Sequence, residues 1–335
     1  MKRLTQDELL QFLKSWETCY DLRVPILLPD GGRAICRLAD GPLAMHGGSV
    51  PAKPTSLFFP QDGLVFAAGA NGYLERVDTE KRLFIIGLTP TDLQCLRFID
   101  RFFSTGERDD LYFASRDKAI IAVVSGYCGR DGEFIPPSSG SCDLELYHDG
   151  IDWLLMPYSD EGRELAASFN AGDEVVSLES VHGKAVHPPS AEQEVVLAAA
   201  AILQETELPD AFWDEIGEHC IQCSGCNLTC PTCTCFGVQD WCYGEHTERR
   251  RVWDSCQLAG FMREAGGHNP LATAGQRSRR RIHHKLVADM SRWGEIGCFV
   301  CGRCDLACPT GIGIIAVSRE IVTRFGMPDD NSKRD

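Results

Sequence analysis

The chain has 335 residues, of which 44% are hydrophobic and 24% are charged, and its formal net charge is −15. This length is enough for two domains with hydrophobic cores, and the acidic balance excludes nucleic-acid binding by the molecule as a whole. The N-terminal stretch has neither the apolar segment of a signal peptide nor a twin-arginine leader. No apolar run approaches the ~20 residues of a membrane helix. We therefore expect a cytoplasmic protein without direct membrane insertion.

The N-terminal half reads as alternating strands and helices. A capping-box pattern starts a helix over residues 5–20, and a second helix covers 91–103. Strand-like runs occupy 23–30, 33–38, 83–88, 119–127, 143–150 and 152–158. The runs at 83–88 and 119–127 are short and apolar, as strands buried on both faces are, and the helix between them suggests a βαβ unit. We predict an α/β domain over residues 1–187, without a glycine-rich phosphate loop.

The second half reads as helical. His187-Pro188-Pro189-Ser190 forms a break, and a new helix starts after Ser190. The region between the two cysteine runs described below has a helical pattern with little strand signal, and an apolar-periodic helix ends the chain. The predicted fold class is thus α+β, with an α-helical ferredoxin-like domain over residues 188–335.

Seventeen cysteines are unevenly placed, and 12 of them fall between Cys220 and Cys308. The spacing C-x2-C-x2-C-x3-C-P occurs twice, at Cys220, Cys223, Cys226, Cys230 with Pro231, and at Cys298, Cys301, Cys304, Cys308 with Pro309. Zinc accepts C-x2-C pairs but does not account for this whole pattern twice. Two copies indicate two [4Fe–4S] clusters.

The fourth cysteine of each run is expected to bind the other cluster, as it does in two-cluster ferredoxins. The sequence then predicts a crossed pairing. Set A is Cys220, Cys223, Cys226 and Cys308, and set B is Cys298, Cys301, Cys304 and Cys230.

Four further cysteines lie in the same region. Cys233, Cys235 and Cys256 are candidate ligands of a third cluster, with Cys242 or a non-cysteine residue as the fourth. The alternative is that they are buried thiols packed near the clusters.

A basic segment separates the two runs. It carries nine cations against Asp254 and Glu264, so its net charge is 9 − 2 = +7; the cations are Arg249, Arg250, Arg251, Arg263, Arg277, Arg279, Arg280, Arg281 and Lys285. Cations near a cluster favour its reduced state and raise its potential. Binding of an acidic partner, of a cofactor phosphate or of RNA is an alternative role for the basic segment. His219, His283 and His284 flank the region, and capping or packing accounts for them better than iron ligation.

These motifs resemble a known family. CIQCSGCNLTCPTCTCF, RRRVWDSC, GHNP, RSRRRIHHK and GCFVCGRCDLACPTGIGI are similar to the iron–sulfur β subunit of cytosolic sulfhydrogenases, and equally to the A subunit of anaerobic sulfite reductase. PTSLFFPQDGLVF, IIGLTPTDLQCLRFIDRFF and DLYFASRDKAIIAVVSGYC extend the resemblance to most of the chain. It implies an electron-transfer subunit that does no substrate chemistry and has no catalytic residues. Its partners would be an FAD flavoprotein that oxidises NAD(P)H and a hydrogenase or sulfite-reductase subunit.

The N-terminal part departs from that family. It has Thr89-Pro90-Thr91-Asp92 where the family often has R-P-C-D, and it keeps only Cys128 and Cys142 where a C-F-C motif is common. We therefore expect no N-terminal cluster, and docking as the sole task of residues 1–187. Two alternatives to electron transfer remain. One is a catalytic iron–sulfur protein with an open third cluster, and the other is a regulatory protein that uses the basic segment on nucleic acid.

Overall fold

The computed structural model describes residues 1–69, 72–74, 81–169 and 189–326. It is a mixed α/β structure with two compact units. Unit 1 comprises Met1–Pro188 together with Val238–Val252, and unit 2 comprises Pro189–Gly237 together with Trp253–Asp335. The predicted boundary between residues 187 and 188 lies outside the described residues, and the division into a docking and a cluster domain stays a prediction.

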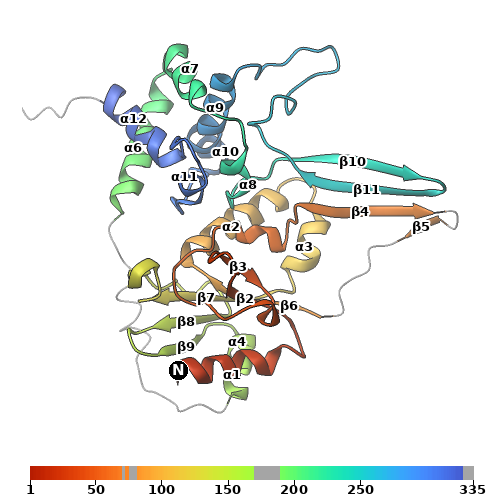
Figure 1. Cartoon of the computed structure of the whole chain (residues 1–335), viewed down its shortest axis with the longest axis vertical. Coiled ribbons are helices and arrows are strands. Elements are labelled where there is room, and N and C mark those ends of the chain that lie inside the picture. The colour runs from red at the N-terminus through yellow and green to blue at the C-terminus, as the bar shows by residue number, and fades with distance from the viewer. Residues whose placement is uncertain (70–71, 75–80, 170–188, 327–335) are drawn as a thin grey trace, which may run out of the picture. The chain divides into compact units, whose positions relative to one another are not determined.

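A seven-stranded sheet forms the centre of unit 1 (Figure 1). Its strand order is β1-β9-β8-β7-β6-β2-β3. The strands are β1 Lys2–Leu4, β2 Asp21–Leu27, β3 Arg33–Cys36, β6 Leu83–Leu88, β7 Ile120–Gly126, β8 Leu144–His148 and β9 Trp153–Pro157. The four inner strands β2, β6, β7 and β8 are parallel, whereas the outer strands pair antiparallel.

Helices cover both faces of this sheet. Helix α1 (Gln6–Trp16) and helix α4 (Asp160–Ser168) share a hydrophobic core with Phe84 and Ile86 of β6. Because successive strand residues point to opposite faces, Ile85 between them faces the other side. There α2 (Pro90–Ser104) contacts β6 and β7. With α3 (Asp110–Arg116) it connects these two parallel strands, so the predicted βαβ unit is confirmed.

A β-hairpin lies where the sequence predicted only helices. β10 (Phe236–Tyr243) and β11 (His246–Trp253) form a second sheet with β4 (Asp62–Gly69) and β5 (Gly72–Leu74), in the order β10-β11-β4-β5. Figure 1 shows this hairpin beside β4, about 180 residues earlier in the chain. The prediction of a purely helical segment was wrong because β10 is an exposed edge strand without a clear apolar alternation.

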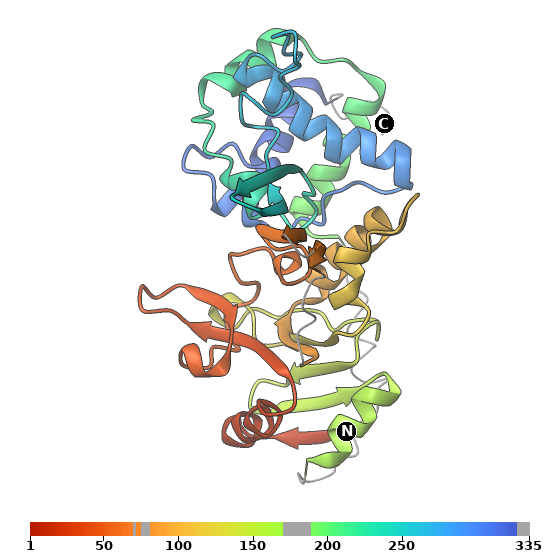
Figure 2. The same ribbon diagram turned by 90° about the vertical axis from the view of Figure 1, so that its right-hand side faces the viewer.

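Unit 2 is built mainly of helices. Its helices are α6 Ala191–Glu205, α7 Asp210–Glu218, α8 Gly225–Leu228, α9 Ala274–His283, α10 Asp289–Trp293, α11 Arg303–Leu306 and α12 Ile314–Phe325. Helix α6 packs on α12, as Figure 1 shows, and α7 packs on α9. Their apolar faces share one core around Trp213 and Ile321. Figure 2 shows the helices of unit 2 in green to blue from another side. No helix among the described residues is long and apolar enough to cross a membrane.

Gly126 offers a test of the unit 1 fold. It ends β7 with φ +83°, and a Cβ there would lie 2.1 Å from the backbone oxygen of His148. Gly126→Ala should therefore lower the free energy of unfolding by more than about 4 kcal/mol, because backbone cannot move aside cheaply. Gly132 has φ +81°, and a Cβ there meets no described atom within 4 Å.

The matched control is Gly132→Ala, which should cost only the roughly 1–2 kcal/mol of a left-handed non-glycine residue. Urea unfolding followed by circular dichroism measures both variants. Equal losses of stability in the two would contradict the predicted clash at His148.

Candidate iron–sulfur sites

The two cysteine runs have the same local structure. Gln222 and Val300, each two residues after the first cysteine of its run, have left-handed φ values of 59° and 52°. Ser224 and Gly302, each directly after the second cysteine, are left-handed too and precede the short helices α8 and α11. Left-handed backbone costs a non-glycine residue roughly 1–2 kcal/mol, and strain of this kind concentrates at functional sites. The repeated sequence is therefore also a repeated structure.

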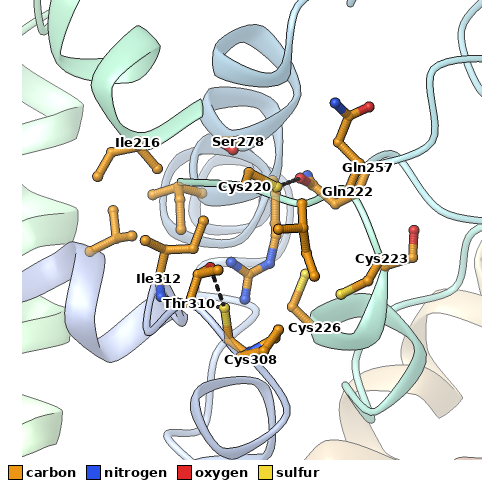
Figure 3. Close-up of a pocket in the computed structure, with 16 residues that line it drawn as sticks. Ile216, Cys220, Gln222, Cys223, Cys226, Gln257, Ser278, Cys308, Thr310 and Ile312 are labelled. Atoms are coloured by element: carbon orange, nitrogen blue, oxygen red, sulfur yellow. Dashed lines mark hydrogen bonds between the residues drawn. The ribbon is translucent and has the colours of Figure 1, made fainter. Parts of the chain in front are cut away.

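The four cysteines of set A line one pocket in unit 2 (Figure 3). Cys220, Cys223 and Cys226 come from the first run, and Cys308 comes from the end of the second run. The Cys308 sulfur accepts a hydrogen bond from the Ile312 backbone N–H at 3.4 Å and lies 3.5 Å from Thr310 Oγ1. Burial disfavours the thiolate of Cys308, but these hydrogen bonds outweigh it and lower its pKa. A lowered pKa favours the thiolate, which is the form that binds iron.

The structure also gathers the cysteines of set B. Burial raises the pKa of Cys298 to about 12 and raises the pKa of Cys304 above that. Burial also raises the pKa of Cys301. The nearby charge of Cys230 adds to the rise in all three. The pKa of Cys230 itself is lowered. Its hydrogen bond with Cys233 is the largest cause, and the charge of Lys285 is a smaller one. The charge of Cys230, the last cysteine of the first run, thus acts on all three other cysteines of set B.

The candidate third set lies around Asn227 in unit 2. The Asn227 amide Nδ2 donates to Cys256 Sγ at 3.1 Å, and its Oδ1 accepts from Cys233 Sγ at 3.7 Å. A hydrogen bond from Cys235 lowers the pKa of Cys256 to about 6. Cys242 is exposed on β10 of unit 1, where it accepts a hydrogen bond from Thr247. Three of the four additional cysteines are therefore close together.

Buried cations accompany these cysteines. Arg281 and Lys285 are 6% and 5% exposed. The Nε and Nη2 atoms of Arg281 find no hydrogen-bond partner among the described residues, although Cys226 and Cys304 are near. A buried charge needs a compensating partner. A four-thiolate iron–sulfur cluster, which is negatively charged and offers sulfur acceptors, fits this environment.

Among the described residues, no group of three Cys, His, Asp or Glu side chains could hold one ion. All 17 cysteines are free of disulfide bonds.

Four other cations of the basic segment form ion pairs. Arg249, Arg250 and Arg251 belong to β11 in unit 1 and form ion pairs with Asp240, with Asp62 and Glu248, and with Asp109 respectively. Arg279 pairs with Glu207 and Asp210 in unit 2. The segment is thus divided between two units, and these ion pairs involve four of its nine cations.

The three flanking histidines cap or pack. His219 ends α7, and its Nδ1 lies 2.9 Å from the Glu215 backbone oxygen. His283 packs against the ring of Trp213 at 5.5 Å, and His284 lies 3.6 Å from Asp289.

Cys128 is buried and Cys142 is partly buried, and the surroundings of both are structural. Cys128 donates to the Ser125 backbone oxygen at 3.3 Å, and Cys142 lies 3.7 Å from Ser138 Oγ. Burial raises the pKa of each thiol to about 12. Thr89 and Asp92, at the other point of departure from the family, form the capping box of α2. The expected loss of an N-terminal cluster stays a prediction.

Sequence reasoning missed the polar residues that hold the cysteine loops. Thr232 Oγ1 donates to the Gly297 backbone oxygen at 2.7 Å and so joins the two runs. The Asp305 carboxylate accepts from the Ile315 and Ala316 N–H groups at the start of α12. No motif marks these residues, because their partners are distant in sequence.

Comparison with known proteins agrees with this site. Residues 219–312 match the 4Fe-4S dicluster domain family. The dicluster domain match spans all eight cysteines of sets A and B. The chain is also 27% identical, over 281 residues, to "Sulfhydrogenase 2 subunit beta" of Pyrococcus furiosus, with 80% of this chain and 82% of that protein covered. The resemblance to sulfhydrogenase β subunits is therefore confirmed. No solved structure gives a significant match.

The match to the sulfhydrogenase subunit extends beyond the dicluster domain. Residues 189–335 are fewer than half of the chain, so a match over 80% of it must reach well into the N-terminal part. These similarities support an iron–sulfur electron-transfer subunit that works together with other subunits.

Proposed function

We propose that this chain relays electrons between a flavoprotein subunit that oxidises NAD(P)H and a terminal redox subunit of the hydrogenase or sulfite-reductase type. Unit 2 would carry two [4Fe–4S] clusters in an α-helical ferredoxin-like arrangement, bound by sets A and B, and the N-terminal domain would dock a partner. The partner classes rest on the name of the Pyrococcus furiosus relative and on the family resemblance. The free cysteines suit the cytoplasm, where thiols stay reduced.

The observation that supports this proposal best is the shared pocket of Cys220, Cys223, Cys226 and Cys308. When bound, [4Fe–4S] clusters exchange single electrons, which suits a chain placed after a hydride-accepting flavin. The cysteines of this chain would hold them. Cys226, Cys298 and Cys304 pack against the hydrophobic core of unit 2, which keeps water away from that side.

Iron analysis tests the proposal. We expect anaerobically purified protein to be brown and to contain about eight iron and eight sulfide atoms per chain, as two cubanes require. Iron and sulfide assays, with electron paramagnetic resonance (EPR) of the reduced protein, measure this. A colourless protein that holds one or two zinc ions would contradict it.

A second candidate function is catalysis at an open third cluster. The observation that favours it is the gathering of Cys233, Cys235 and Cys256 around Asn227. It requires about twelve iron atoms per chain, and an EPR signal that changes when sulfite or a thiol is added. About eight iron atoms and an unchanged spectrum leave these residues as packed thiols and favour the relay.

A further inference from the structure

Helix α9 and the short π-helix that continues it, His284–Ala288, carry a row of cations on one face. Arg277, Arg281 and Lys285 follow one another at four-residue intervals, which places them on the same side of a helix. All three are buried, whereas the neighbouring Arg280 is exposed. Arg280 and Arg281 have the same chemistry, but Arg281 is buried and Arg280 is exposed.

Arg281 faces cysteines of both predicted sets. It lines the same pocket as Cys226 and Cys308 of set A. It is also close to Cys304 and Cys230 of set B, and these thiolates together with that of Cys226 raise the pKa of its guanidinium against the opposing effect of burial. The guanidinium is thus a permanent positive charge with a neighbour in each set.

The neighbours of Lys285 include cysteines of set B. Its Nζ donates to Thr232 Oγ1 at 2.7 Å and to the Gly297 backbone oxygen at 3.3 Å. The nearby thiolates that favour its charge include Cys230 and Cys298, both of set B. Arg303, 2% exposed, also lies near set B, where burial raises the pKa of Cys301 and the charge of Arg303 partly offsets that rise. Arg281 differs from both because it lines the pocket of the set A cysteines, whereas Lys285 and Arg303 are not among the residues that line that pocket.

We propose that Arg281 is a counter-ion shared by the two clusters, which raises both reduction potentials together, and that Lys285 serves the set B cluster alone. This inference rests on the proposed function. The step is a one-electron transfer with a reduced flavin of the partner as donor and the terminal redox subunit as acceptor, and no bond is made or broken. Each reduction adds one negative charge beside Arg281, so the cation stabilises the reduced state of either cluster. Arg281 is a positioning residue that sets potentials.

The test is an EPR-monitored redox titration of the full chain, purified without oxygen, in three variants. Arg281→Gln should keep both clusters and lower both midpoint potentials, each by at least a tenfold change in the oxidised-to-reduced ratio, which is 59 mV for one electron. Lys285→Gln should lower one potential only. The matched control is Arg280→Gln, which removes the same charge from an exposed site of the same helix and should move neither potential.

The outcomes separate this inference from the proposed function. A wild-type protein without iron overturns the proposed function. If Arg281→Gln holds its full iron content and one or both midpoint potentials do not change, the proposal of a shared counter-ion is overturned. If Arg281→Gln does not hold iron, Arg281→Lys decides, because it keeps the charge. Two clusters with near-wild-type potentials in Arg281→Lys support the inference, whereas loss of iron or a comparable fall in potential there overturns it.

Discussion

Replacing Cys308 with alanine should remove the cluster of the first cysteine run, even though Cys308 belongs to the second. The reason is the predicted crossed pairing, and Cys308 lines one pocket with Cys220, Cys223 and Cys226. Spin integration of the reduced protein by EPR should fall from about two intact clusters per chain to about one. Cys19, an exposed cysteine of unit 1, gives the control, and Cys19→Ala should leave both clusters intact.

Double variants identify which cluster is lost. Under crossed pairing, Cys223→Ala combined with Cys308→Ala affects one cluster only, so about one should remain. Cys301→Ala combined with Cys308→Ala affects both, so none should remain. The reverse result, with none in the first double variant and one in the second, would show that each run holds its own cluster.

Removal of iron should unfold unit 2 and spare unit 1. The helices α8 and α11 have four residues each and cannot be stable alone. Without clusters, the buried charges of Arg281 and Lys285 lose their compensating partner, and breaking a buried pair in this way costs about 3–5 kcal/mol. Binding of a structural metal group is in this sense part of the folding free energy.

Hydrogen exchange before and after anaerobic chelation measures this effect in each unit. We expect amide protection in α6, α7, α9 and α12 to be lost, because these helices share the core around the cysteine runs. The strands β6, β7 and β8 should keep their protection and serve as the internal control. Retained protection in the four helices of the iron-free protein would show that the helical core folds without clusters.

The sequence predicted the parallel part of the sheet well, for a local reason. The strands β6 and β7 are buried on both faces, so each is a short continuous apolar run in the sequence. Helix α2 between them was predicted over residues 91–103, and the structure adds the capping box of Thr89 and Asp92 at its start. Such signals lie within a few residues of one another and need no knowledge of the fold.

The hairpin had no such signal. β11 pairs with β4, with Arg251 opposite Gly63, and nothing in either segment specifies a partner almost 190 residues away. The strand β10 exposes Val238 and Trp241, so its pattern lacks the alternation of a half-buried strand. The pairing depends on the folding of unit 1 as a whole.

The cysteine runs show the same division between sequence and structure. The spacing of the eight cysteines, together with the prolines after Cys230 and Cys308, was enough by itself to predict iron–sulfur clusters, because few metal groups require that pattern. Composition also showed that the region is basic. It could not show which cations are buried beside the cysteines. Arg280 and Arg281 are adjacent and identical in type, and only the packing of α9 in the helical core turns one to solvent and the other toward the thiolates.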